Sequence, residues 1–155
     1  MRFLVFALVL CLCVLHWQVS GAPGTACSSD DDCTAGTEKC SNSTCKCKKG
    51  YEPNNDDSAC DECATGYYKD TVANTDCTIV SQGHFSADNS GTSVSSGGQS
   101  EEPCPSGKYA GSTGSTACTT AAAGYYATTT SSTYVVGASY TAITSAATVQ
   151  TQCPA

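Results

Sequence analysis

The chain has 155 residues, with 14 carboxylates against seven basic side chains and a formal net charge of -7. Only six lysines remain after Arg2, so binding to a phosphate backbone has no basic patch to work with, and nucleic acid is excluded as a partner. From Ala22 onward the chain contains no Leu, Met or Trp and only nine residues of Val, Ile and Phe. No ordinary hydrophobic core can form from these residues. The 13 cysteines therefore predict a fold that is held by crosslinks.

Residues 1–21 are predicted to be a secretory signal peptide. Arg2 precedes the apolar run FLVFALVLCLCVL, and the small-residue stretch VSGA follows at residues 19–22. The run of 13 residues is shorter than the roughly 20 that a membrane span needs, which disfavours an anchor. Cleavage after Gly21 or Ala22 fits the pattern, and we favour Gly21. The 11 cysteines that remain then enter an oxidising compartment, which predicts a secreted or extracellular protein with disulfides.

Residues 27–60 contain six cysteines that are separated by 5, 6, 4, 1 and 12 residues. Two cysteines that flank a single residue on an extended strand point to opposite faces. Cys45 and Cys47 therefore each need a different partner. Six cysteines allow 15 connectivities, and spacing alone does not choose among them.

This spacing, with Gly50 and Tyr51 three and four places after Cys47, resembles an EGF-like module and its invertebrate relative, the EB module. The pairing that the resemblance implies is Cys27 with Cys40, Cys33 with Cys45, and Cys47 with Cys60.

The residues of this segment also suggest three other roles. A zinc site could use the thiolates of Cys45, Cys47, Cys60 and Cys63. Cys60 and Cys63 also form a CxxC motif, but no pattern of strand and helix surrounds it that would predict a redox site. The acidic stretches 30–32 and 54–57 offer oxygen ligands for calcium, but neither has the spacing of a known loop, and solvated turns are the favoured interpretation. No metal or other cofactor is expected.

Beyond Cys60 the chain repeats itself. CATGYYKDTVANTDC (63–77) and CPSGKYAGSTGSTAC (104–118) share two cysteines 14 positions apart, a glycine at the third following position and a tyrosine at the fifth. A second glycine follows 17 residues after the first in each copy, at Gly83 and Gly124. We predict one repeat over 63–103 and another over 104–152.

The CxxGxY pattern is similar to the cysteine-rich repeats of ephrin-receptor and growth-factor-receptor ectodomains and of ciliate surface antigens. Those repeats usually carry further cysteines near the glycine, and here none follows Cys77 or Cys118 before the next glycine. We therefore expect two small independent loops, closed by Cys63 with Cys77 and by Cys104 with Cys118.

Residues 153–155, CPA, match the opening of the second repeat, CPS. We expect them to begin a third repeat that is cut short, so that Cys153 is unpaired; an intermolecular thiol is the alternative. Between the crosslinks, the Gly- and Ser-rich stretch 86–102 is predicted to be a flexible linker. Residues 127–152 form a Ser- and Thr-rich tract whose composition suits O-glycosylation, disorder or short strands. Asn42-Ser43-Thr44 is an N-glycosylation sequon.

No catalytic site is expected. His84 is the only histidine after the leader, and the equivalent repeat positions hold Tyr67, Lys108 and Tyr125. Such variety indicates a surface position. We therefore disfavour His84 as a general base that works with Ser81 or Asp88.

Together these features predict a small disulfide-rich fold of β-hairpins and loops, with little helix after the leader, as tandem extended modules without a large hydrophobic core. We expect a non-enzymatic secreted or cell-surface protein that binds an extracellular protein or glycan ligand or forms a coat, with a membrane attachment only if further sequence supplies an anchor. The alternatives are a free secreted ligand or disulfide-rich inhibitor, acting through the loop 34–39 or 48–59, and a glycosylated matrix or wall component.

Overall fold

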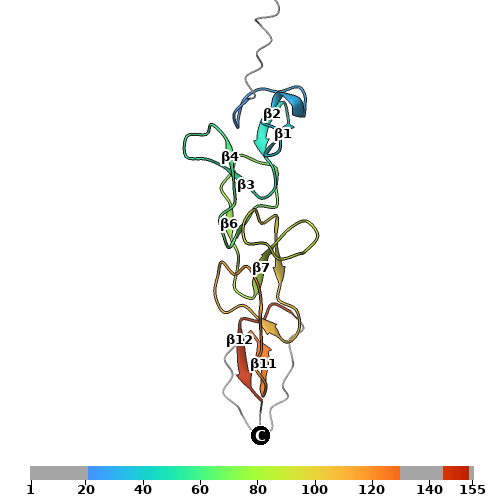
Figure 1. Ribbon diagram of the computed structural model, residues 1–155, viewed down its shortest axis with the longest axis vertical. Coiled ribbons are helices and arrows are strands. Elements are labelled where there is room, and N and C mark those ends of the chain that lie inside the picture. The colour runs from blue at the N-terminus through green and yellow to red at the C-terminus, as the bar shows by residue number, and fades with distance from the viewer. Residues whose placement is uncertain (1–20, 130–144, 154–155) are drawn as a thin grey trace, which may run out of the picture.

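The computed structural model describes residues 21–129 and 145–153. Most of the predicted leader and residues 130–144 of the Ser- and Thr-rich tract lie outside the described residues. The described chain is an elongated rod in which short hairpins follow one another in sequence order, from β1 and β2 at one end to β11 and β12 at the other (Figure 1). This arrangement is the extended architecture that the composition predicts.

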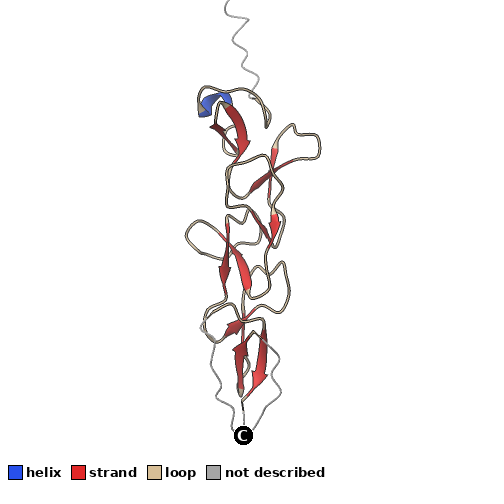
Figure 2. Ribbon diagram, turned by 180° about the vertical axis from the view of Figure 1, so that it is seen from behind, coloured by secondary structure: helices blue, strands red, loops and turns tan. Residues whose placement is uncertain are grey.

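Regular structure in the described chain consists of one short 3-10 helix, η1 (Asp30–Asp32), and antiparallel hairpins, each formed by two consecutive strands. Figure 2 shows that turns and loops connect these strands throughout the rod. The predicted fold class is therefore confirmed. The strands are β1 (Glu38–Ser41), β2 (Thr44–Cys47), β3 (Tyr51–Pro53), β4 (Cys60–Glu62), β5 (Tyr67–Tyr68), β6 (Thr78–Ile79), β7 (His84–Ala87), β8 (Ser100–Pro103), β9 (Lys108–Tyr109), β10 (Thr119–Thr120), β11 (Tyr125–Thr128) and β12 (Val149–Gln152).

The buried interior of the described chain consists mainly of sulfur and methyl groups. Its buried apolar residues are cysteines and alanines together with a single valine, Val80. Such small side chains bury little apolar area, so they contribute little hydrophobic free energy. The crosslinks and the backbone hydrogen bonds must therefore supply most of the order.

One turn recurs five times along the rod. In each copy a glycine with φ between 79° and 82° occupies the third position of a four-residue turn. The fourth residue of the turn donates its N–H to the carbonyl of the first. Positive φ at the third position, preceded by a residue of negative φ, is the type II β-turn, which favours glycine. Each turn leads directly into the first strand of a hairpin. The glycines are Gly50, Gly66, Gly83, Gly107 and Gly124.

We call the residue three places before each glycine the anchor. The anchors are Cys47, Cys63, Val80, Cys104 and Ala121, and each begins a unit. The glycine carbonyl of each unit accepts the N–H of the next anchor, at distances between 2.6 and 3.0 Å. After Ala121 the next residue to make this bond is Cys153, which donates to Gly124. The units therefore run 47–62, 63–79, 80–103, 104–120 and 121–152, so that each predicted repeat of about 40 residues contains two hairpins.

A second set of hydrogen bonds joins the anchor of each of the first four units to the loop of the next unit. The anchor carbonyls of Cys47, Cys63, Val80 and Cys104 accept the N–H of Ala73, Gly97, Gly114 and Ala146 respectively, at 2.8–3.1 Å. Each acceptor and its donor lie in consecutive units. The turn glycine also contacts the unit after next: a Cβ at Gly66 would collide with the backbone of Gly114. The rod is therefore a continuous stack of hairpins.

The prediction of a flexible linker over 86–102 is wrong. Residues 84–87 form β7 and pair with residues 100–103 of β8. In the loop between them, the Asp88 carboxylate accepts the N–H groups of Ser90 and Thr92, and the Ser86 hydroxyl donates to the carbonyl of Val94 at 2.7 Å. Gly and Ser composition indicated flexibility, but the same short polar side chains also bond readily to nearby backbone.

Candidate functional site

Ten described cysteines form five disulfides in the pairs that the sequence and the resemblance predict. They join Cys27 to Cys40, Cys33 to Cys45, Cys47 to Cys60, Cys63 to Cys77, and Cys104 to Cys118. All five close short loops, with sequence separations of 12–14 residues. This density of disulfides indicates an oxidising environment.

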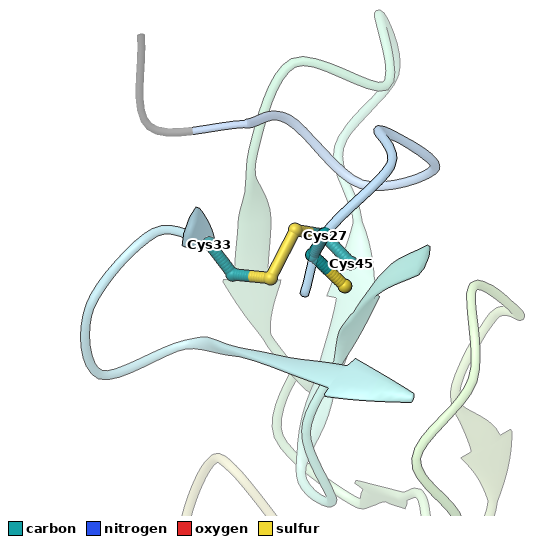
Figure 3. A group of neighbouring side chains, drawn as sticks. All are labelled: Cys27, Cys33 and Cys45. Atoms are coloured by element: carbon teal, nitrogen blue, oxygen red, sulfur yellow. A yellow bond between two sulfur atoms is a disulfide. The ribbon is translucent and has the colours of Figure 1, made fainter. Parts of the chain in front are cut away.

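The sulfur atoms of Cys27, Cys33 and Cys45 lie within 4.8 Å of one another at the end of the rod that β1 and β2 occupy (Figure 3). A metal needs thiolates as ligands. Here Cys33 is bonded to Cys45, and Cys27 to Cys40, so none of the three sulfurs is a thiolate. Figure 3 draws the disulfide between Cys33 and Cys45, with the sulfur of Cys27 beside it. The four cysteines of the zinc alternative, Cys45, Cys47, Cys60 and Cys63, are likewise divided among three disulfides.

Sequence reasoning missed two units whose anchors are not cysteine. Cys47, Cys63 and Cys104 are each bonded to a cysteine that lies three residues before the next anchor. Val80 and Ala121 have no sulfur, and the corresponding positions hold Glu101 and Gln150. In these two units a hydrogen bond from the residue after the anchor takes the place of the disulfide. Ser81 N–H donates to Glu101 Oε2 at 2.9 Å, and Ala122 N–H donates to Gln150 Oε1 at 2.8 Å. The signal in the sequence was the glycine three residues after Val80 and Ala121.

Cys153 has an exposed, free thiol. Its N–H donates to the carbonyl of Gly124 at 2.6 Å, as Cys63 donates to Gly50 and Cys104 to Gly83. Cys153 therefore occupies an anchor position. Pro154 and Ala155 lie outside the described residues.

Asn42 lies at the tip of the β1–β2 hairpin. Asn42 and Ser43 have φ values of 54° and 59° and form the two-residue turn between Ser41 and Thr44, as in a type I′ turn. Both turn residues are exposed, and Thr44 is half-buried. An oligosaccharide at Asn42 would therefore point away from the rod, which suits the predicted glycosylation site.

The side chain of His84 makes a local contact only. Its Nδ1 lies 3.1 Å from the carbonyl oxygen of Gln82. The Ser81 hydroxyl donates to Glu101, and Asp88 accepts hydrogen bonds from its own loop. The hydrogen bonds of these three side chains therefore go to other partners and not to one another.

The two acidic stretches that were considered for calcium are largely occupied by local hydrogen bonds. Asp30 accepts the N–H of Cys40 at 2.9 Å, and Asp32 accepts the N–H groups of Ser28 and Ser29. Asp56 accepts both the N–H and the hydroxyl of Ser58, and these bonds lower the pKa of its carboxyl. These contacts show each stretch stabilising its own turn.

The β1–β2 hairpin has two faces of opposite character. Glu38, Cys40, Cys45 and Cys47 alternate onto the inner face, where Glu38 is only 2% exposed and accepts the N–H of Thr34 at 2.9 Å. Lys39 and Lys46 stand directly opposite each other on the outer face. The N–H of Lys48 extends the ladder by donating to Thr37, which places Lys48 on the same outer face as Lys46. We call Lys39, Lys46 and Lys48 the lysine face.

The next hairpin carries a pair of the opposite sign. Glu52 in β3 and Asp61 in β4 are directly opposite each other. They line a surface pocket, which we call the carboxylate pocket, together with Pro53, Asn54, Asn55 and Asp56. Asp61 and Asn55 are exposed, whereas Glu52 is half-buried and accepts the N–H of Cys77 at 2.7 Å. The hairpin therefore presents several carboxylates at one place on the rod.

Compared with protein-family models, with curated proteins and with solved structures, the chain matches none. Among the residues that the structure describes, no helix is long and apolar enough to cross a membrane. A function for this chain must therefore be argued from its own geometry.

Proposed function

We propose that the protein is a non-enzymatic, extracellular rod that serves as a coat or binding element on or near the cell surface. The observation that carries the proposal is the turn that recurs at five glycines, with its backbone bonds and disulfides. A stack of this kind extends a chain without a large core, and crosslinks of this kind persist in oxidising compartments. The resemblance of 27–60 to EGF-like modules, and of the later repeats to receptor-type cysteine-rich repeats, supports the same function.

The geometry suits a surface for macromolecules better than a site for chemistry. Catalysis requires groups that converge in a space from which water is excluded. In the described chain the His84 side chain contacts the carbonyl of Gln82, the Ser81 hydroxyl bonds to Glu101, and Asp88 bonds to its own loop. The expected partner is therefore an extracellular protein or glycan that contacts the outside of the rod.

The proposal is tested by expressing the full chain with a C-terminal tag in cells that have a eukaryotic secretory pathway. We expect the protein in the medium, with an N-terminus at Ala22, five disulfides, and an N-linked oligosaccharide that is lost in Asn42→Gln. Recovery of the chain in the cytosol, with its leader intact and its cysteines reduced, would contradict an extracellular function.

A second measurement separates a coat from a free ligand. Antibodies against residues 27–118 should label the exterior of intact, unpermeabilised source cells if the rod is a coat element. Protein that is found only in the medium, with unlabelled cells, would favour the secreted ligand or inhibitor instead.

A further inference from the structure

We propose that the lysine face of one chain binds the carboxylate pocket of a second copy of the same chain. Self-association goes beyond the proposed extracellular function, and purified protein tests it whichever compartment the protein occupies. The proposal rests on two cross-strand pairs. Lys39 and Lys46 form a positively charged pair, and Glu52 and Asp61 form a negatively charged pair.

The lysine face is electrostatically unfavourable in the isolated chain. Residues directly opposite each other in an antiparallel pair have their Cβ atoms about 4.5–5.5 Å apart, and like charges in this position destabilise a hairpin. Lys48 adds a third ammonium group, whose Nζ donates to the carbonyl of Gly36 at 3.3 Å. Within the described residues, no carboxylate forms an ion pair with Lys39 or Lys46. A partner that brings carboxylates to this face would remove the repulsion.

The carboxylate pocket has the matching spacing. Glu52 and Asp61 occupy the same cross-strand relationship as the two lysines, in a hairpin of the same antiparallel kind. The pocket is concave and includes the exposed carboxylates of Asp56 and Asp61. Lys69 already interacts electrostatically with Glu52, so Asp61 and Asp56 are the carboxylates left for a partner. Two neighbouring ammonium groups that approach these carboxylates would relieve the repulsion within the lysine face.

The charge distribution favours a second copy as the occupant. Residues 38–49 carry four lysines and one carboxylate, Glu38, which faces inward. Residues 50–103 carry ten carboxylates and one lysine, Lys69, whose Nζ is turned inward to the carbonyls of Ala73 and Thr75. Each copy thus offers one basic face and one acidic pocket on adjacent hairpins. A long sulfated polysaccharide would neutralise only a few of its charges on three lysines and would then meet the acidic remainder of the rod.

The test is sedimentation equilibrium of the full secreted chain at about 0.15 M salt, where a screening length of about 8 Å suppresses repulsion between the net charges but leaves close contacts. The thiol of Cys153 is alkylated beforehand, so that no disulfide can link two copies. We expect the wild type to associate reversibly as its concentration rises.

Two charge-reversal variants address the two surfaces. Lys39→Glu/Lys46→Glu reverses the lysine face, and Asn55→Lys/Asp61→Lys reverses the pocket without touching Glu52 or Asp56, which hold backbone bonds. Each variant alone should weaken self-association about tenfold or more. An equimolar mixture should restore it, because the intact pocket of the first variant faces the intact lysine face of the second. Lys108→Glu and Asp70→Lys change charge on exposed residues outside the two surfaces and should leave association unchanged.

The mixture also controls for folding, since misfolded variants would not regain association on mixing. The proposal is overturned if the wild type stays monomeric to about millimolar concentration, where even weak rim contacts would be visible. Association of both reversal variants at the wild-type strength, or a mixture that stays dissociated, overturns it equally. A monomeric wild type that binds a sulfated polysaccharide through Lys39 and Lys46 would assign the lysine face to a glycan and also refute self-association.

Discussion

The side chain of Asn74 bonds to the backbone of both Cys45 and Cys47, the latter 27 residues earlier in the chain. Its Oδ1 accepts the N–H of Cys47 at 2.9 Å, and its Nδ2 donates to the carbonyl of Cys45 at 3.1 Å. The adjacent Ala73 N–H donates to the carbonyl of Cys47 at 3.1 Å. This contact joins the loop of the second unit to the N-terminal crosslinked segment and continues the rod across their junction.

Replacing Asn74 by Ala should therefore loosen the junction. Loss of two hydrogen bonds at an exposed side chain should lower the free energy of unfolding by about 1–2 kcal/mol. Hydrogen exchange at the Cys47 amide should accelerate, as measured by NMR. Asn74→Asp keeps the acceptor but loses the donor, so it should protect the Cys47 amide partly. Asn89→Ala, at an exposed asparagine in the loop between β7 and β8, is the matched control, and equal exchange in Asn74→Ala and wild type would refute this contact.

A sixth disulfide should form at the third unit. Val80 and Glu101 occupy the places that Cys63 and Cys77 hold one unit earlier. Val80→Cys/Glu101→Cys should therefore be oxidised without rearrangement and should raise stability by about 3 kcal/mol under non-reducing conditions.

Mass mapping of the unreduced protein, together with urea unfolding, checks that prediction. Ala121→Cys/Gln150→Cys is the corresponding variant two units later. Cysteines that stay reduced at both sites, or that exchange with the native pairs, would show that the units are not equivalent.

Alanine at the turn glycines should distinguish the interior of the stack from its end. Gly66 and Gly124 have φ values of 79° and 82°, so either alanine is strained by about 1–2 kcal/mol. Only Gly66 is covered: its Cβ would collide with the backbone of Gly114, whereas nothing lies within 4 Å of a Cβ at Gly124. Gly66→Ala should therefore lose at least about 1 kcal/mol more than Gly124→Ala in denaturant unfolding. Equal losses would indicate that the contact between units two apart does not hold in solution.

The loop at Asp88 should depend on acid pH. Hydrogen bonds from the Ser90 side chain and from the N–H groups of Thr92 and Ser90 lower the pKa of the Asp88 carboxyl below its ordinary value of 3.8. A lowered pKa in the folded state stabilises the loop fully above the unfolded value of 3.8, and this stabilisation disappears as pH falls through the folded pKa. Titration of the carboxyl by NMR should give a midpoint below 3.8, with the Ser90 and Thr92 amides shifting together. A midpoint at or above 3.8, or amide shifts that persist in Asp88→Asn, would contradict it.

Native protein that lacks the leader should react with one equivalent of a thiol reagent per chain. Cys153 is the exposed free cysteine of the described residues, and the other ten are in disulfides. The reaction should disappear in Cys153→Ser. Two or more reactive thiols in the native protein would mean that one of the five crosslinks does not form.

The composition and spacing of the sequence determined that this protein is a crosslinked, hairpin-rich chain. Nine residues of Val, Ile and Phe after the leader cannot supply a core, and the buried interior is indeed mainly cysteine and alanine. The two short crosslinked loops, 63–77 and 104–118, were predictable because they are local and their cysteines repeat at one interval. The pairing in 27–60 was suggested by the resemblance, since spacing alone left several connectivities open.

Only the tertiary structure decided that Val80 and Ala121 are anchors like Cys47, Cys63 and Cys104, and that the anchor carbonyl of each of the first four units bonds to the loop of the next. Those bonds join backbone N–H and C=O groups, which nearly every residue type offers. The residue types at positions 80 and 121 therefore do not reveal the bonds. Strand register also decided that residues 86–102 are ordered and that the two charge pairs of opposite sign form. Pairing decides which polar side chains stand side by side, and composition alone does not contain the register.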